Sequence, residues 1–151
     1  RAARIEREER GFYLQASRLA PEETGCRMFE QLAGDEARHL EMIRRHQASL
    51  RRGNQWAAHS PAGPGPVNLD RPLFPRSRAV LEQAIATATR GAGTLLFGLD
   101  VESRSYDMYR EAAAMTADPQ GRSVLESLAG EESLHFEILM MRYEFLYGAV
   151  A

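Results

Sequence analysis

The chain has 151 residues, with 19 basic and 21 acidic side chains and a formal net charge of −2. This length suits a single domain over residues 1–151 with its own core, and the small negative charge gives no reason to expect a nucleic-acid partner. A single cysteine, Cys26, excludes an internal disulfide and a cysteine-rich metal site. No apolar run approaches the roughly 20 residues of a membrane span. No secretory signal opens the sequence, so we expect a protein of the reducing cytoplasm.

The first 52 residues predict a helical hairpin. Residues 1–19 are rich in Glu, Arg, Ala and Leu, which favour helix, and their apolar members recur at helical spacing. Pro21 suits the first turn of a second helix, and the two glutamates that follow it suit the positive end of a helix dipole. We expect this second helix to run to about Arg52 and to stop at Gly53.

The middle of the chain predicts a long connector and a short helix. Residues 53–76 are rich in proline and glycine, a composition typical of a connector. Residues 77–90 predict a short extra helix that ends near Gly91. A connector of about 25 residues, at roughly 3.3 Å per residue, is long enough to cross the whole length of a long helix.

A second helical hairpin is expected over residues 94–148. Its first helix covers about residues 94–116, and Asp118 followed by Pro119 predicts the cap and first turn of the last helix. That helix is expected to run to about Gly148. No segment shows the alternation of apolar and polar residues that is typical of a strand, so the predicted fold class is all-α.

Two short segments of the chain are nearly the same: Leu32–His39 reads LAGDEARH and Leu128–His135 reads LAGEESLH. Each contains Glu-x-x-His. Another Glu lies thirty residues before the Glu of each motif, and a Tyr lies seven residues after that earlier Glu. The whole set repeats 96 residues later: Glu6, Tyr13, Glu36 and His39 are followed by Glu102, Tyr109, Glu132 and His135.

The thirty-residue gap predicts that these side chains meet at one height. The residue midway between Glu6 and Glu36 is Pro21, and the midpoint of the second pair of glutamates is Ala117, so both midpoints fall at the predicted turns. In each hairpin, the stretch of about 14 helical residues between a glutamate and the turn rises about 21 Å along the helix axis. Within Glu-x-x-His, the i, i+3 spacing places Glu and His on one helix face. Two hairpins joined by a long crossover form the ferritin-like four-helix bundle. Six side chains would then converge at its centre.

Four carboxylates and two imidazoles in a bundle interior predict two metal ions. Close carboxylates repel one another, and two divalent cations would balance their charge. Oxygen and imidazole ligands without thiolate favour two iron ions, with manganese as the alternative and zinc disfavoured. We predict bridging by Glu36 and Glu132, terminal carboxylate ligation by Glu6 and Glu102, and one nitrogen ligand per metal from His39 and His135.

Other polar residues near the motifs are interpreted differently. Tyr13 and Tyr109 are either core aromatics or donors of a hydrogen bond to a ligand carboxylate on a neighbouring helix. We expect four acidic residues beside the motifs on the helix surface, namely Asp35, Glu41, Glu131 and Glu137. His46, whose repeat mate is an arginine, is expected to be a packed bundle histidine and not a ligand.

At these motifs the chain resembles the rubrerythrin-like branch of the ferritin-like superfamily. The resemblance covers the four helices and implies a di-iron bundle that reacts with hydrogen peroxide or dioxygen, often as a homodimer. Rubrerythrins carry a rubredoxin module with four cysteines, whereas this sequence has one cysteine. They also place a further Glu three residues after the ligand of the third helix, where this chain has Ser105. These departures favour an external electron-donor protein, or a role in oxidising ferrous iron.

Two other functions stay open at this point. An iron-handling protein would oxidise and store iron, which requires a large hollow assembly. A structural bundle would keep the same residues without binding metal. The sequence alone does not separate these from a di-iron oxidoreductase.

Overall fold

The computed structural model describes residues 1–53, 55–57 and 92–148. The described chain forms four helices and no strand: α1 (Ala2–Leu19), α2 (Glu23–Gly53), α4 (Gly93–Met115) and α5 (Pro119–Tyr147). The fold is therefore the predicted all-α, ferritin-like bundle. Most of the expected connector over residues 53–76 and all of the expected helix over 77–90 lie outside the described residues.

The helices begin close to the predicted positions, with one difference at α2. α5 begins as expected, because the Asp118 side chain accepts a hydrogen bond from the Gly121 backbone N–H at 2.9 Å. α2, however, begins at Glu23, so Pro21 precedes the helix and does not lie in its first turn. The reason is that the carbonyl of Glu22 already accepts the backbone N–H of Cys26, which makes Glu22 the residue that flanks the helix.

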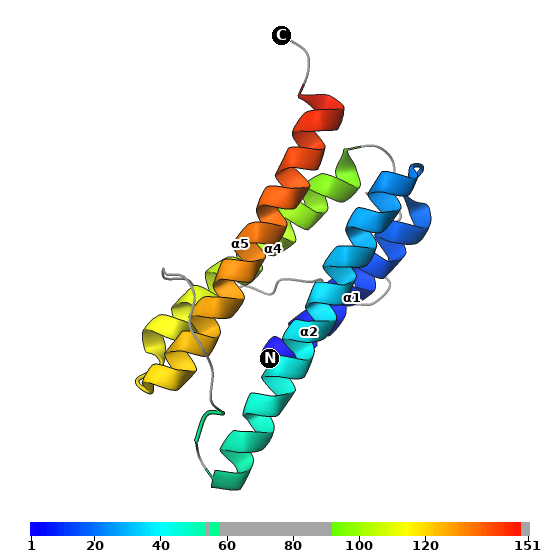
Figure 1. The fold of residues 1–151 in the computed structure, drawn as a ribbon. Helices are drawn as coiled ribbons and strands as arrows, with labels where there is room; N and C mark the ends of the chain where they lie inside the picture. Colours follow the sequence, from blue (N-terminus) through cyan, green and yellow to red (C-terminus); the bar gives the residue numbers. More distant parts are fainter. Residues whose placement is uncertain (54, 58–91, 149–151) are drawn as a thin grey trace.

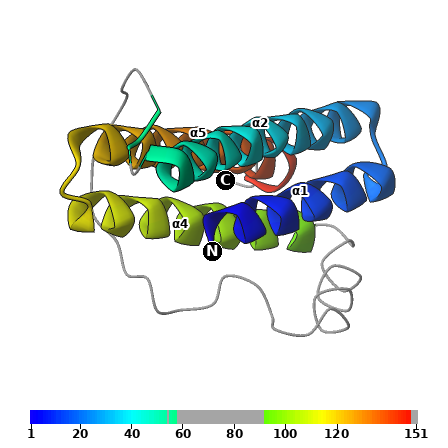
Figure 2. The same cartoon turned by 90° about the horizontal axis from the view of Figure 1, so that it is seen from below.

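The helices form two antiparallel hairpins that lie against each other. α1 packs along α2, and α4 packs along α5. The end of α2 and the beginning of α4 lie at opposite ends of the bundle, so α2 and α4 run in the same direction (Figure 1 and Figure 2). Parallel second and third helices of this kind are typical of the ferritin-like bundle. Among the described helices, none is long and apolar enough to cross a membrane.

The apolar core is divided into two clusters. One includes Ile5, Ile43, Val101, Met108, Tyr109, Val124, Leu128 and Ala129. The other includes Phe12, Tyr13, Ala16, Phe29, Leu32, Ala33, Leu95, Leu99 and Leu139. On α2 and α5 the members of the two clusters are separated in sequence by the Glu-x-x-His motifs. The motifs therefore form a buried polar layer between two apolar layers.

Candidate metal centre

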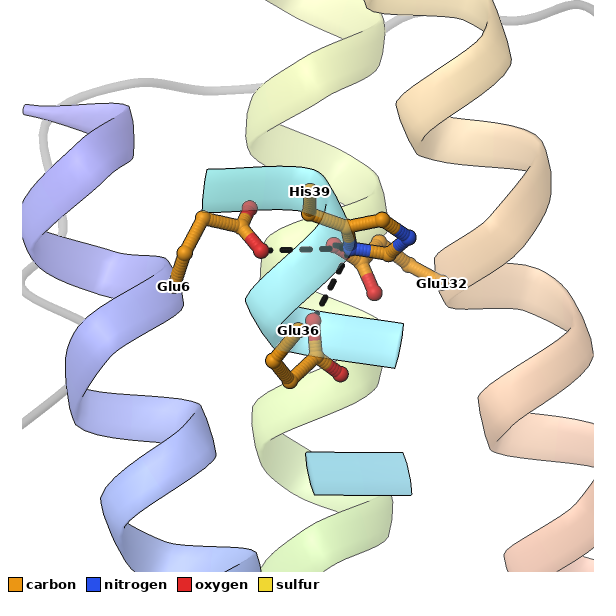
Figure 3. Close-up of side chains that lie close together, drawn as sticks. All are labelled: Glu6, Glu36, His39 and Glu132. Carbon is orange, nitrogen blue, oxygen red and sulfur yellow. Dashed lines mark hydrogen bonds and ion pairs between the residues drawn. The ribbon is translucent and has the colours of Figure 1, made fainter. Parts of the chain in front are cut away.

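The structure brings all six sequence-predicted ligands together in this polar layer. They are almost wholly buried, with exposed fractions of 0–2%. They form two groups whose potential ligand atoms lie within 4.8 Å of one another. The first group is Glu6, Glu36, His39 and Glu132, and the second is Glu36, Glu102, Glu132 and His135. Figure 3 shows the first group, with each helix but α4 contributing to it.

Two of the six residues, Glu36 and Glu132, belong to both groups. They face each other from α2 and α5, the two helices that carry Glu-x-x-His. Glu6 on α1 and Glu102 on α4 each belong to one group. This is the arrangement that two adjacent cations would need, with two shared carboxylates between them and one carboxylate at either end. The assignment of each residue as a ligand remains a prediction.

Both histidines direct the same ring nitrogen toward the carboxylates. Nδ1 of His39 lies 2.9 Å from Glu36 Oε2 and 3.1 Å from Glu6 Oε2. Nδ1 of His135 lies 2.9 Å from Glu36 Oε1 and 3.2 Å from Glu132 Oε2. The two imidazole rings are stacked, with centroids 5.4 Å apart and planes inclined by 18°. The Nδ1 atoms are therefore the nitrogens available to a metal on either side of Glu36.

The donor set fits a pair of cations. Neither oxygen of Glu36 or of Glu132 has a partner in hydrogen-bond geometry among the described residues, although histidine nitrogens lie nearby. Buried polar atoms are normally satisfied, so four carboxylate oxygens at the centre of the layer are left to bind something else. Two divalent cations would supply both the missing partners and the missing positive charge.

The electrostatics of the metal-free cluster agree with this interpretation. Burial, together with the negative charge of Glu132, raises the pKa of Glu6 to about 8. Burial also raises the pKa of Glu102 above its ordinary value. Although burial opposes their charged form, the carboxylates around His39 and His135 raise the pKa of both histidines. In the absence of cations the cluster therefore holds protons in the place of positive charge.

The two repeated tyrosines contact the two terminal carboxylates. The Tyr13 hydroxyl donates a hydrogen bond to Glu102 Oε1, and the Tyr109 hydroxyl donates one to Glu6 Oε1. Both side chains are fully buried, and burial together with the nearby carboxylate charges raises the pKa of both hydroxyls. Each tyrosine therefore stays a protonated donor, and each orients a carboxylate of the other hairpin.

Sequence reasoning missed one buried carboxyl group. Glu9 lies on α1 three residues after Glu6 and is fully buried. Neither of its oxygens has a hydrogen-bond partner in the part of the chain that the structure describes. Burial, together with the charge of Glu132, raises its pKa well above the ordinary value. Its i, i+3 spacing from Glu6 was the available signal. Its repeat mate is Ser105, which is also buried.

Two acidic residues expected on the surface contact the histidines instead. Glu131 Oε2 lies 3.0 Å from Nε2 of His39, and Asp35 Oδ2 lies 3.4 Å from Nε2 of His135. Their side chains are only 37% and 20% exposed. The expectation was wrong because it considered each helix alone. Where α2 and α5 face each other, each acidic residue reaches the histidine of the other helix.

Three other polar residues near the motifs, His46, Glu41 and Glu137, belong to neither group. His46 is buried and packs against the ring of Trp56 at 5.6 Å between ring centroids, so it is a packed bundle histidine. Glu41 and Glu137 are exposed on the helix surface.

Comparison with known proteins agrees with this geometry. The model of the Rubrerythrin family matches residues 1–143. No curated protein and no solved structure matches the chain significantly. The match extends over both hairpins and includes every residue of the two groups. The chain therefore belongs to the rubrerythrin family.

Proposed function

We propose that this protein is a di-iron oxidoreductase that reduces hydrogen peroxide or dioxygen with electrons from an external donor protein. The observation that carries the proposal is the pair of four-residue groups that share Glu36 and Glu132. Two metal ions held by shared carboxylates can act together on one small oxidant. Oxygen and imidazole donors without thiolate favour iron, with manganese as the alternative.

A bound iron pair would supply the two electrons that peroxide needs to become water. The protein's own residues do the rest. Glu36 and Glu132 would hold the ions next to each other, and the two buried apolar clusters shield the site from bulk water. Tyr13 and Tyr109 hold the terminal carboxylates in place and keep their hydroxyl protons.

An external donor and a homodimer are parts of the same proposal. The sequence has a single cysteine, so these residues provide no thiolate-bound electron relay of their own. Three exposed apolar side chains, Leu134 (56%), Met141 (63%) and Phe145 (75%), are spaced along α5. Exposed apolar groups at helical spacing favour association, so we propose that this face of α5 joins two copies. The scarcity of cysteine also favours the cytoplasm.

The experiment is a single-turnover reaction of the iron-loaded protein. Protein reconstituted with Fe²⁺ without oxygen is mixed with less than one equivalent of hydrogen peroxide, or with dissolved dioxygen. We expect two Fe²⁺ oxidised for each peroxide consumed, and a faster reaction with one of the two oxidants. Glu41→Ala, an exposed change next to the site, should react like the unaltered protein. Protein that binds iron but consumes neither oxidant would refute the proposed activity.

Oxidation and storage of ferrous iron is the second candidate, because a site of this kind oxidises Fe²⁺ as it turns over. Sedimentation separates the two. Storage requires a hollow assembly of many copies, whereas a dimer leaves no interior for a mineral. Retention of far more than two iron atoms per chain after repeated additions of Fe²⁺ would favour storage.

A further inference from the structure

Two acidic residues outside the predicted ligand set contact the outer nitrogens of both histidines. Glu131 of α5 lies 3.0 Å from Nε2 of His39 on α2, and Asp35 of α2 lies 3.4 Å from Nε2 of His135 on α5. Asp35 and Glu131 are 96 residues apart, so they are mates in the internal repeat. Each half of the chain thus provides a carboxylate for the histidine of the other half.

With a metal ion at Nδ1, these contacts would leave the proton on the outer nitrogen, Nε2. An ionised carboxylate only accepts hydrogen bonds, and Glu131 Oε2 lies at hydrogen-bond distance from His39 Nε2, 3.0 Å away. His39 Nε2–H therefore donates to Glu131, and His135 Nε2 lies 3.4 Å from Asp35 Oδ2, within ion-pair distance. In a neutral imidazole whose Nε2 is protonated, Nδ1 keeps its lone pair. Nδ1 is the nitrogen that faces the carboxylate layer in both histidines.

An arginine connects the two acidic residues. The Arg38 guanidinium donates a hydrogen bond to Asp35, and it lies 3.7 Å from Glu131 Oε2. Arg38 is 63% exposed, whereas the histidines are buried. A continuous series of polar contacts therefore joins α2 to α5 on the Nε2 side of the two histidines. In order, it includes His39, Glu131, Arg38, Asp35 and His135.

We propose that Asp35, Arg38 and Glu131 form a clamp across the two hairpins that positions both histidines with Nδ1 toward the metal pair. The inference rests on the proposed metal site and adds positioning residues to it. An imidazole without such a partner can turn its ring and exchange its tautomer, whereas a carboxylate on the outer nitrogen fixes both. Because each partner comes from the other hairpin, both histidines are positioned only when the hairpins are docked.

The test measures metal affinity without measuring activity. Co²⁺ is titrated into the full chain against a competing chelator, and binding is followed by visible absorption. Loss of such an outer partner typically costs about 10–100-fold in metal affinity, so we expect a loss of about tenfold or more for Asp35→Ala and for Glu131→Ala. Glu131→Gln keeps an acceptor and should recover part of the loss. Glu41→Ala and Glu137→Ala, exposed on the same two helices, are the controls and should bind like the unaltered protein.

A second measurement tests the crossed pairing. In protein loaded with Zn²⁺, which is diamagnetic, side-chain ¹⁵N NMR should show metal at Nδ1 and a proton at Nε2 of both histidines. Glu131→Ala should change the Nε2 signal of His39, which lies on the other hairpin, and leave that of His135 on its own helix. Asp35→Ala should do the reverse. A general loss of structure would change both signals together, so the crossed pattern is specific to the clamp.

The outcomes are distinguishable from those of the proposed function. If the unaltered protein binds neither Co²⁺ nor Zn²⁺, the metal site and the clamp are both wrong. If it binds two ions and the alanine variants bind as tightly as the controls, the clamp is wrong and the metal site stands. A changed signal only on the histidine of the same helix also overturns the clamp. Asp35 and Glu131 are partly exposed, so their alanine variants should fold. If Glu131→Ala does not fold, the metal affinity of Glu131→Gln tests the clamp in its place.

Discussion

The Tyr13 hydroxyl on α1 donates a hydrogen bond to Glu102 on α4, so a buried hydrogen bond joins a residue of the first hairpin to a predicted metal ligand of the second. The repeat mates form the equivalent hydrogen bond in the other direction, from Tyr109 of the second hairpin to Glu6 of the first. The carboxylates at the two ends of the site are therefore oriented by the opposite hairpin. The site is therefore complete only where the two hairpins are packed together.

Removal of either hydroxyl should destabilise the bundle. Tyr13→Phe or Tyr109→Phe leaves a buried carboxylate oxygen without its donor, which costs about 1–3 kcal/mol and lowers the melting temperature by about 2–4 °C per kcal/mol in a chain of this size. Thermal unfolding followed by circular dichroism measures the effect. Tyr147→Phe, at a residue that is 41% exposed, is the control. Equal melting temperatures for all three variants would show that the two buried bonds contribute nothing.

The shared carboxylates should matter more for metal content than the terminal ones. Glu36→Ala removes a donor from both groups and should lose nearly all bound metal, as should Glu132→Ala. Glu6→Ala removes a donor from one group and should keep about one ion per chain. Elemental analysis of reconstituted, desalted protein gives the count. An empty site in Glu41→Ala together with a full site in Glu36→Ala would mean that the proposed ligand assignment is wrong.

The buried carboxyl of Glu9 should cost stability in the metal-free protein. Glu9→Met keeps a similar volume and removes a buried polar group that lacks a partner among the described residues. An unsatisfied buried group costs about 1–3 kcal/mol, so the melting temperature of the metal-free variant should rise by a few degrees. Ser105→Ala, at the repeat mate, is the comparison and should have the smaller effect. A lower melting temperature for Glu9→Met would show that the carboxyl has a stabilising partner.

The metal-free protein should lose stability between pH 5 and pH 8. Burial, together with the charge of Glu132, raises the pKa of Glu6 from 4.5 to about 8 and also raises the pKa values of Glu9 and Glu102. A raised folded-state pKa stabilises the fold fully below the unfolded value, and that contribution is lost as the pH rises through the folded value. The raised pKa values of His39 and His135 act in the same direction above pH 6.5.

The pKa of Glu132 is lowered to about 2, which does not oppose this trend. Its contribution to the stability of the fold is already complete above pH 4.5 and is lost only as the pH falls below that value. Metal binding requires deprotonated ligands. The increase in melting temperature that metal produces should therefore be larger at pH 8 than at pH 5, by more than about 4 °C, or roughly 1–2 kcal/mol. Thermal scans of metal-free and metal-loaded protein at both pH values measure it. A metal-free melting temperature that rises steadily with pH would contradict the account.

Much of the site could be predicted because its information is local and repeated. The spacing of Glu and His within one motif depends on the geometry of one helix, and the thirty-residue gap depends on one turn. Asp118 identified the start of α5 for the same reason, since a cap acts within one helical turn. Features that depend on a single helix or a single hairpin are thus accessible from the sequence.

The features that were missed depend on how the hairpins face each other. Asp35 and Glu131 look like surface residues on their own helices, and only the approach of α2 to α5 places them on the histidines. Glu9 is a charged residue in a helix rich in charges, so its burial follows from docking and not from local pattern. Pro21 was misplaced by a residue or two because the sequence does not reveal which carbonyl begins the hydrogen-bonded turn.

The central claim is tested most directly by anomalous diffraction from crystals of protein purified without chelator, recorded on both sides of the iron and manganese absorption edges. The account predicts two peaks about 3.5–4 Å apart, both between Glu36 and Glu132, with one next to His39 and the other next to His135. A strong change in both peaks across one edge identifies the metal. Crystals of reconstituted protein with no anomalous peak inside the bundle, or with a single peak outside the carboxylate layer, would contradict it.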